Sequence, residues 1–157
     1  VLQVADRAVT ITAEEGRRRT LILDGDRLLV AGPPETLPLR VEAWLKRTAL
    51  DLLITETAEF ARKAGVTVTA VAVGDPRGRW GSCASGGTIR YSWRLLLAPG
   101  WVRRATVAHE VAHRVHMNHG PAFHALAARL DAGTGRAARD WLRVNGAALH
   151  AVGAPGQ

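Results

Sequence analysis

Five consecutive residues in the second half of the chain carry the residue types that zinc chemistry needs. They are His109-Glu110-Val111-Ala112-His113, a run of the form H-E-x-x-H. On an α-helix, residues four apart lie on one face, about 6 Å apart along the axis, so His109 and His113 can share one zinc ion. Glu110 lies about 100° round the helix, where its carboxylate can take a proton from a water on the metal's open side. The alternative is an amphipathic helix with two partly exposed histidines.

A catalytic zinc site usually has three protein ligands, and two later histidines compete for the third place. His116 lies on the same helix face, but about 10 Å along the axis from the first histidine, which is too far for one ion. His119 directly precedes Gly120-Pro121, which marks a chain leaving its helix, and the turn can bring its imidazole back to the metal. No glutamate follows the H-E-x-x-H run, so a glutamate ligand from a later helix is excluded. The sequence favours His119 as third ligand, with Asp131 as a weaker alternative.

Length and composition predict one globular domain. The chain has 157 residues, 47% of them apolar, which is enough to bury a core. It contains no apolar run of membrane-spanning length and no signal-peptide pattern, so we expect no membrane partner. Cys83 is the one cysteine, which excludes an internal disulfide and fits a reducing, cytoplasmic location.

The formal charge of +7 raises the question of a nucleic-acid partner. Among the 21 basic residues only Lys46 and Lys63 are lysine, and alanine and glycine are abundant. This excess of arginine over lysine, together with the abundant alanine and glycine, is as typical of a proteome-wide compositional bias as of a binding surface. Arg17-Arg18-Arg19 is the one dense basic run, and it is equally typical of a solvated turn. The charge supports a nucleic-acid partner only weakly.

Periodicity predicts an α+β order of elements. Residues 1–31 show strand patterns, with a hairpin of 21–23 and 28–30 around an Asp- and Gly-rich turn. One long helix is expected over 39–64, with Thr36 as its cap and Gly65 at its end. Residues 66–73 and 88–93 are expected to form an antiparallel pair across a glycine-rich loop. Zinc peptidases commonly place such a strand above the metal, so the open edge of 88–93 is expected there, where an extended peptide can pair with it. Further helices are expected around the H-E-x-x-H run, with Pro99 in the first turn, and over 121–130 and 138–149.

Several side chains near this expected site have open roles. Tyr91, Arg90 and His124 are candidates for stabilising an oxyanion, although a lone tyrosine is more often packed in a strand. A triphosphate or an acidic peptide could bind to three arginines, Arg79, Arg90 and Arg94. The alternative is that these arginines form a solvated strand edge. Trp80 and Cys83 are expected to pack beneath the loop. The alternative for Cys83 is that it binds or inhibits the metal.

Four motifs occur together in the order seen in YgjP-like metallopeptidases, which the chain resembles. These are Arg79-Trp80-Gly81-Ser82-Cys83, Ile89-Arg90-Tyr91-Ser92-Trp93-Arg94-Leu95, His109-Glu110-Val111-Ala112-His113 and Met117-Asn118-His119-Gly120-Pro121-Ala122-Phe123. Members of this mostly bacterial family have a zincin fold related to the SprT-like and WLM groups. The resemblance is strong over residues 75–145 and loose over the N-terminal hairpins. It implies that His109, His113 and His119 bind one zinc and that Glu110 is the catalytic base.

The chain departs from the family pattern in three places. Gly120 stands where the family usually has serine, His124 stands where tryptophan is usual, and the N-terminal region is shortened. The first two changes affect the shape of the pocket rather than the metal. One branch of the family is also associated with pyrophosphatase activity on UTP, so the resemblance specifies the fold more securely than the substrate.

We therefore expect a single zincin-like α+β domain over residues 1–157, with an N-terminal hairpin region at 1–31 and a catalytic core at about 36–150. Its expected function is zinc-dependent hydrolysis of peptide bonds in a peptide or protein substrate. One alternative is metal-dependent hydrolysis of nucleoside triphosphates. A second is a nucleic-acid- or ribosome-associated binding module with a structural metal, against which the intact Glu110 argues, because a structural site needs no base.

Overall fold

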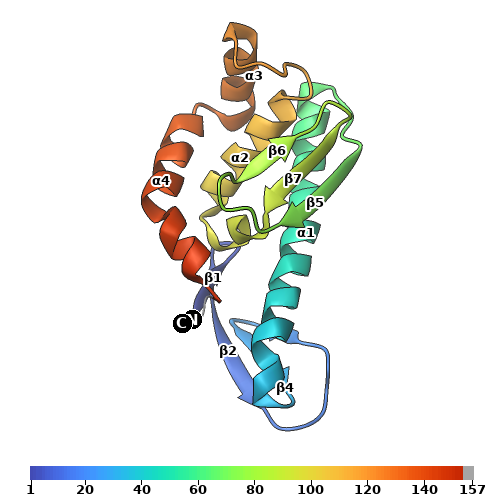
Figure 1. The fold of residues 1–157 in the computed structure, drawn as a ribbon, viewed down its shortest axis with the longest axis vertical. Helices are drawn as coiled ribbons and strands as arrows, with labels where there is room; N and C mark the ends of the chain where they lie inside the picture. Colours follow the sequence, from blue (N-terminus) through green and yellow to red (C-terminus); the bar gives the residue numbers. More distant parts are fainter. Residues whose placement is uncertain (154–157) are drawn as a thin grey trace.

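Four α-helices and two small β-sheets form residues 1–153, the part of the chain that the computed structural model describes (Figure 1). Residues 154–157, the end of the expected domain, lie outside the described residues. With two 3₁₀ helices, η1 and η2, the elements in chain order are β1 (Leu2–Val4), β2 (Arg7–Glu14), β3 (Ile22–Asp24), β4 (Arg27–Ala31), η1 (Pro34–Thr36), α1 (Leu37–Ala64), β5 (Ala70–Gly74), β6 (Gly81–Cys83), β7 (Thr88–Ser92), η2 (Trp93–Leu97), α2 (Gly100–Ala112), α3 (Pro121–Asp131) and α4 (Gly135–Ala151). None of these helices is long and apolar enough to cross a membrane.

The N-terminal sheet has the strand order β1-β2-β4-β3 and lies beside the first half of α1 (Figure 1). The expected hairpin is confirmed, because β3 and β4 pair antiparallel and Gly25 supplies the turn with a φ of 62°. Val9, Leu28 and Val30 are buried in the same core as Leu45 of α1. The alternating apolar residues of these strands therefore attach the sheet to the long helix.

Helix α1 confirms the long helix expected from the sequence. Gly65 ends it in the left-handed conformation, with a φ of 72°. The expected cap is wrong in one detail: Thr36 occupies the N-cap position, but its hydroxyl donates to the carbonyl of Pro33 rather than accepting from the helix. The buried stripe of α1, including Ala49, Leu53 and Phe60, faces the core.

The second sheet corrects the expected strand pairing. Its order is β5-β7-β6, and β5 pairs with β7 in parallel rather than antiparallel. The cause is β6, Gly81–Cys83, which forms within the expected loop and folds back antiparallel onto β7. Strand β7 is therefore central, and the expectation that 88–93 forms an open edge is wrong. The open edge beside α2 belongs to β6.

Helix α2 occupies the middle of the helical layer and contacts α1, α3 and α4 (Figure 1). Its side chains Val102, Val107 and Val111 are fully buried. Pro99 takes the N-cap position, one residue before the first turn where it was expected. The expected helices that follow are confirmed as α3 and α4.

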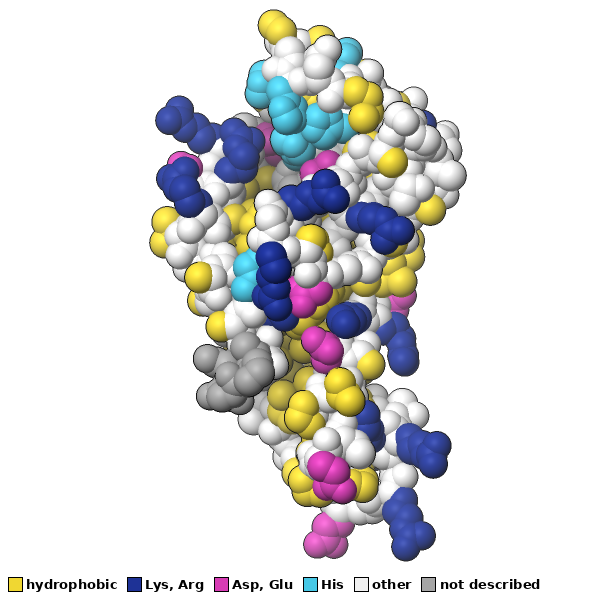
Figure 2. Space-filling view, viewed as in Figure 1, with side chains coloured by type: hydrophobic (Ala, Val, Ile, Leu, Met, Phe, Trp, Pro, Cys, Tyr) yellow, Lys and Arg dark blue, Asp and Glu magenta, His cyan; other side chains and the backbone are white. Residues whose placement is uncertain are grey.

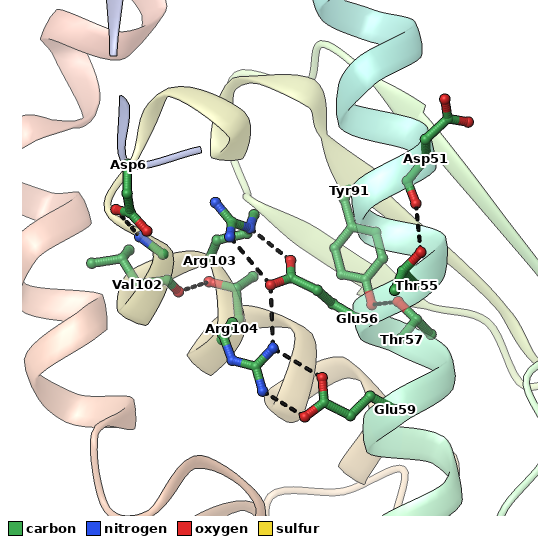
Figure 3. Close-up of polar contacts among 12 residues, drawn as sticks. Asp6, Asp51, Thr55, Glu56, Thr57, Glu59, Tyr91, Val102, Arg103 and Arg104 are labelled. Carbon is green, nitrogen blue, oxygen red and sulfur yellow. Dashed lines mark hydrogen bonds and ion pairs between the residues drawn. The ribbon is translucent and has the colours of Figure 1, made fainter. Parts of the chain in front are cut away.

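An ion-pair network joins α1 to α2 (Figure 3). The Nε of Arg103 donates to Oε1 of Glu56 at 2.6 Å, and both partners are almost fully buried. Arg104 binds Glu59 with two hydrogen bonds of 3.0 and 2.8 Å and also reaches Glu56. Two arginines and two carboxylates thus fix α2 against α1, and α2 carries the H-E-x-x-H run.

Glu59 gives this network a measurable pH dependence. Hydrogen bonds from Arg104 lower the pKa of Glu59 from 4.5 to about 2. A carboxylate with a depressed pKa in the folded state contributes its stabilisation fully above pH 4.5 and loses it as the pH falls toward 2. We expect Glu59→Gln to lower the free energy of unfolding by about 1 kcal/mol near neutral pH and to reduce its loss in acid.

Urea unfolding between pH 2.5 and 6 measures both effects, and the difference from wild type isolates this carboxylate from other titrating groups. Glu42→Gln is the matched control, because among residues 1–153 Glu42 forms its one ion pair with Lys46 of the same helix. An acid dependence of Glu59→Gln identical to that of wild type would contradict the prediction.

Candidate metal and catalytic site

Three histidines converge at the end of α2. Each of His109, His113 and His119 offers a ring nitrogen, and these three atoms lie within 4.8 Å of one another. The Nε2 atoms of His113 and His119 are 3.0 Å apart. Among the described residues this group includes neither His116 nor Asp131, the two alternatives for a third ligand. The cluster thus brings together the three residues that the sequence favoured.

The chain turns sharply after α2, which ends at Ala112. His113 follows as the C-cap residue, and its Nδ1 lies 3.0 Å from the backbone carbonyl oxygen of His116. A carbonyl only accepts, so Nδ1 carries the proton and donates, and the lone pair of Nε2 faces His119. If His116 were the third ligand, α2 would have to continue as far as His116, but it ends at Ala112. His116 contributes its backbone to the site.

Phe123 of α3 packs against two of the histidines. Its ring stacks on His113 with centroids 4.4 Å apart and meets His109 edge-on at 5.0 Å. The Phe123 side chain is fully buried, so it holds both imidazoles against the core. The sequence showed Phe123 only as part of a motif, and nothing in its spacing indicated this contact.

The chemistry of these residues fits a transition-metal ion. Burial lowers the pKa of His109 to about 4, with smaller contributions from the neighbouring histidines and Arg139. Burial also lowers the pKa of His113. At neutral pH these imidazoles are uncharged, the form that binds a metal. Three converging imidazoles match the donor set of a catalytic zinc site, in which the fourth position is left for water.

Glu110 lies beside the cluster without belonging to it. Its side chain is 6% exposed, and burial raises its pKa to about 7, although the charge of Arg79 opposes the shift. The carboxylate packs directly against β6: a Cβ built on Gly81 would lie 2.9 Å from Oε2 of Glu110. The close approach of strand and carboxylate therefore requires glycine at this position. With a pKa near 7, Glu110 can both accept and release a proton at neutral pH.

A cavity of about 160 Å³, which we call the site cavity, adjoins His109 and Glu110. It lies between α2, α3, α4 and β6, and its lining includes Phe123, His124 and Arg139. Histidine side chains gather on this face of the molecule, with Lys and Arg side chains around them (Figure 2). The sequence had indicated His124 as a site residue. Arg139 was missed, because it lies on a helix far along the chain and belongs to no motif.

Two of the expected site residues have structural roles instead. Tyr91 is fully buried, and its hydroxyl lies 2.8 Å from Oγ1 of Thr57 (Figure 3), so of the two roles that the sequence left open it has the packed strand role and not the oxyanion role. Arg94 is 3% exposed and donates to Asp75 and to the backbone carbonyls of Leu149 and Val152. It holds the end of α4 and is neither a solvated edge residue nor a substrate ligand.

The remaining candidates lie around β6. Arg79 and Arg90 are exposed and line a second hollow beside the strand. Trp80 packs against α4, stacked on His150 with centroids 4.8 Å apart. Cys83 is partly buried, burial raises the pKa of its thiol, and the described metal-binding group does not include it.

The chain was compared with models of known protein families to find the family it belongs to. A model of the YgjP-like metallopeptidase domain matches residues 2–145. The chain belongs to the YgjP-like metallopeptidase family. The match includes the N-terminal sheet, which the motifs alone resembled only loosely. The mixed α+β fold is compatible with a YgjP-like domain.

Membership in the YgjP-like family indicates a metal-dependent peptidase, a metal cofactor and a peptide or protein substrate. The three converging histidines could hold that metal. The family match gives no support to nucleotide or nucleic-acid partners. Comparisons with curated proteins and with solved structures found no match.

Proposed function

We propose that this chain is a zinc-dependent metallopeptidase with a zincin-like fold, formed by residues 1–157 as one domain. His109, His113 and His119 hold one zinc ion, and Glu110 is the general base. The observation that carries the proposal is the arrangement itself: three converging ring nitrogens beside a buried carboxylate whose pKa is raised to about 7. A structural metal site has no use for such a carboxylate.

The protein's own groups account for the proton transfers. A bound zinc ion supplies Lewis-acid chemistry, which polarises a carbonyl oxygen and acidifies water. Oε2 of Glu110 rests against Gly81, so Oε1 is the oxygen turned further from the strand. Glu110 takes the proton of the attacking water at that oxygen and later delivers it to the leaving nitrogen. The packing of Gly81 against Glu110 keeps the carboxylate in place between the two transfers.

The open edge of β6 supports a peptide substrate. Bonds from Ser92 N–H to the Trp80 carbonyl and from Ala84 N–H to the Thr88 carbonyl set the register of β6 on β7. In an antiparallel pair the bonded positions alternate, so the backbone groups of Gly81 and Cys83 point to the open edge. An extended peptide can pair with these groups directly beside Glu110. A nucleotide has no backbone that could do so.

The proposal is tested with zinc-loaded protein on blocked peptides of mixed sequence, analysed by mass spectrometry, and on UTP in parallel. Peptide-bond cleavage should stop with a chelator and return with zinc. Hydrolysis of UTP with all peptides left intact would favour the pyrophosphatase alternative. Salt-sensitive retention on heparin without hydrolysis of either substrate would favour the binding-module alternative.

Gly81→Ala tests the contact between β6 and Glu110. The new Cβ would lie 2.9 Å from Oε2, and the flexible carboxylate can move more easily than the strand. We expect a fall in kcat of about tenfold or more with little change in melting temperature, because the displaced group is the base. Gly86→Ala is the control, since a Cβ at Gly86 would meet no atom within 4 Å. Unchanged kcat in Gly81→Ala would show that the position of Glu110 does not depend on the strand.

A further inference from the structure

Three arginines near the candidate site make no ion pair within residues 1–153. The nearby acidic groups are used elsewhere: Asp75 pairs with Arg94 and Arg77, and Asp140 pairs with Arg143. The three arginines without a carboxylate within ion-pair distance, all exposed, are Arg79, Arg90 and Arg139. Their charges are therefore available to a ligand.

These arginines occupy two hollows that meet at the open strand. Arg139 lines the site cavity, and Arg79 and Arg90 line a second hollow of about 250 Å³. Gly81 lines both hollows. A peptide paired with β6 at Gly81 thus runs past a guanidinium group in each hollow. Figure 2 shows Lys and Arg side chains around the histidines on this face.

The arginines lie close to the candidate site, because Arg139 lines the same cavity as His109 and Glu110. The opposing acidic group in the site cavity is Asp131, whose Oδ1 already accepts from the N–H of Gly133 at 2.7 Å. The two hollows together are lined by these three arginines and by two carboxylates besides Glu110: Asp131, and Asp75, which is already paired with Arg94 and Arg77.

We propose that the preferred substrate is an acidic peptide segment whose carboxylates, close to the scissile bond, bind Arg139 in the site cavity and Arg79 with Arg90 in the second hollow. The inference rests on the proposed peptidase function, and it adds the chemical class of the substrate. The planar guanidinium group matches a carboxylate with two parallel hydrogen bonds. Because these arginines are exposed, each contributes an effect on the order of fivefold rather than thousands.

Binding is measured by calorimetry on zinc-loaded Glu110→Gln protein, which holds peptides without cleaving them. Two decapeptides blocked at both ends serve as probes; they are identical except that glutamates at the centre of one are glutamines in the other. A third probe is the glutamine peptide with a free C-terminal carboxylate. We expect the glutamate peptide to bind about tenfold more tightly than the blocked glutamine peptide at low salt.

Variants then locate the effect. Adding Arg139→Gln or Arg79→Gln should weaken binding of the glutamate peptide by about fivefold and leave binding of the glutamine peptide unchanged. Arg143→Gln is the matched control, because it removes the same charge from the same helix but lies outside both hollows. A gain seen only with the free C-terminal carboxylate would overturn the acidic segment and would identify the chain end as the carboxylate that binds.

Equal binding of all three probes, no binding, or a preference that survives both arginine substitutions would overturn the inference. The proposed function is judged separately, from cleavage of the blocked glutamine peptide by wild-type protein. Cleavage without preference for acid would contradict only the substrate class. A binding preference that depends on these arginines, without any cleavage, would contradict only the peptidase function.

Discussion

Glu110→Gln is expected to remove most of the turnover while leaving zinc bound. The residue lies outside the group of three ring nitrogens, so its charge is not needed to hold the ion. Glutamine keeps the shape that packs against Gly81 but cannot accept the water's proton. General-base catalysis contributes roughly 10²- to 10⁴-fold, and we expect kcat to fall by that amount.

Zinc content by mass spectrometry and kcat on the same preparation test this expectation. Glu42→Gln is a suitable control, because it neutralises a carboxylate on the surface of α1 whose one ion pair in the described part of the chain is with Lys46. Full zinc occupancy with undiminished hydrolysis in Glu110→Gln would remove Glu110 from the role of base.

The second large effect is expected at the third histidine. His119→Ala should weaken zinc binding by more than about 100-fold, since even partners behind the ligands are worth about 10- to 100-fold. His116→Ala should leave the affinity near that of wild type, because His116 contributes only its backbone carbonyl, which alanine retains.

Competition with a chelator of known affinity measures both variants, and circular dichroism checks that each is folded. Release of zinc by His116→Ala together with retention by His119→Ala would mean that the turn after α2 differs from the one described. The third ligand would then have to be reassigned.

Local patterns predicted the parts of the fold whose causes are local. The hairpin follows from two apolar runs around Gly25, and α1 follows from apolar spacing that ends at Gly65. Strand β6 could not be predicted in the same way, because Gly81-Ser82-Cys83 contains no β-branched or aromatic residue. Its extended form comes from pairing with β7. The parallel pairing of β5 with β7 is a non-local contact, because β6 lies between these two strands in the sequence.

In the candidate site, too, local sequence patterns predicted some residues and not others. Helical spacing placed His109 beside His113, and the expected turn at Gly120-Pro121 placed His119 near both. Arg139 comes from an element distant in sequence, so local spacing held no information about it, and Phe123 follows His119 closely but its motif did not indicate that its ring packs on the imidazoles. The open edge was assigned to the wrong strand because the number of strands was wrong.

The shortness of β6 has a consequence for which proteins this site can attack. The strand is three residues long, and its free backbone groups need a partner whose own N–H and C=O groups are unpaired. In a native protein most of these groups are already engaged in helices and sheets. If substrates pair with β6, properly folded proteins are protected by their own hydrogen bonding. Loosened termini, unstructured loops and damaged or unfinished chains are then the material that the site can reach.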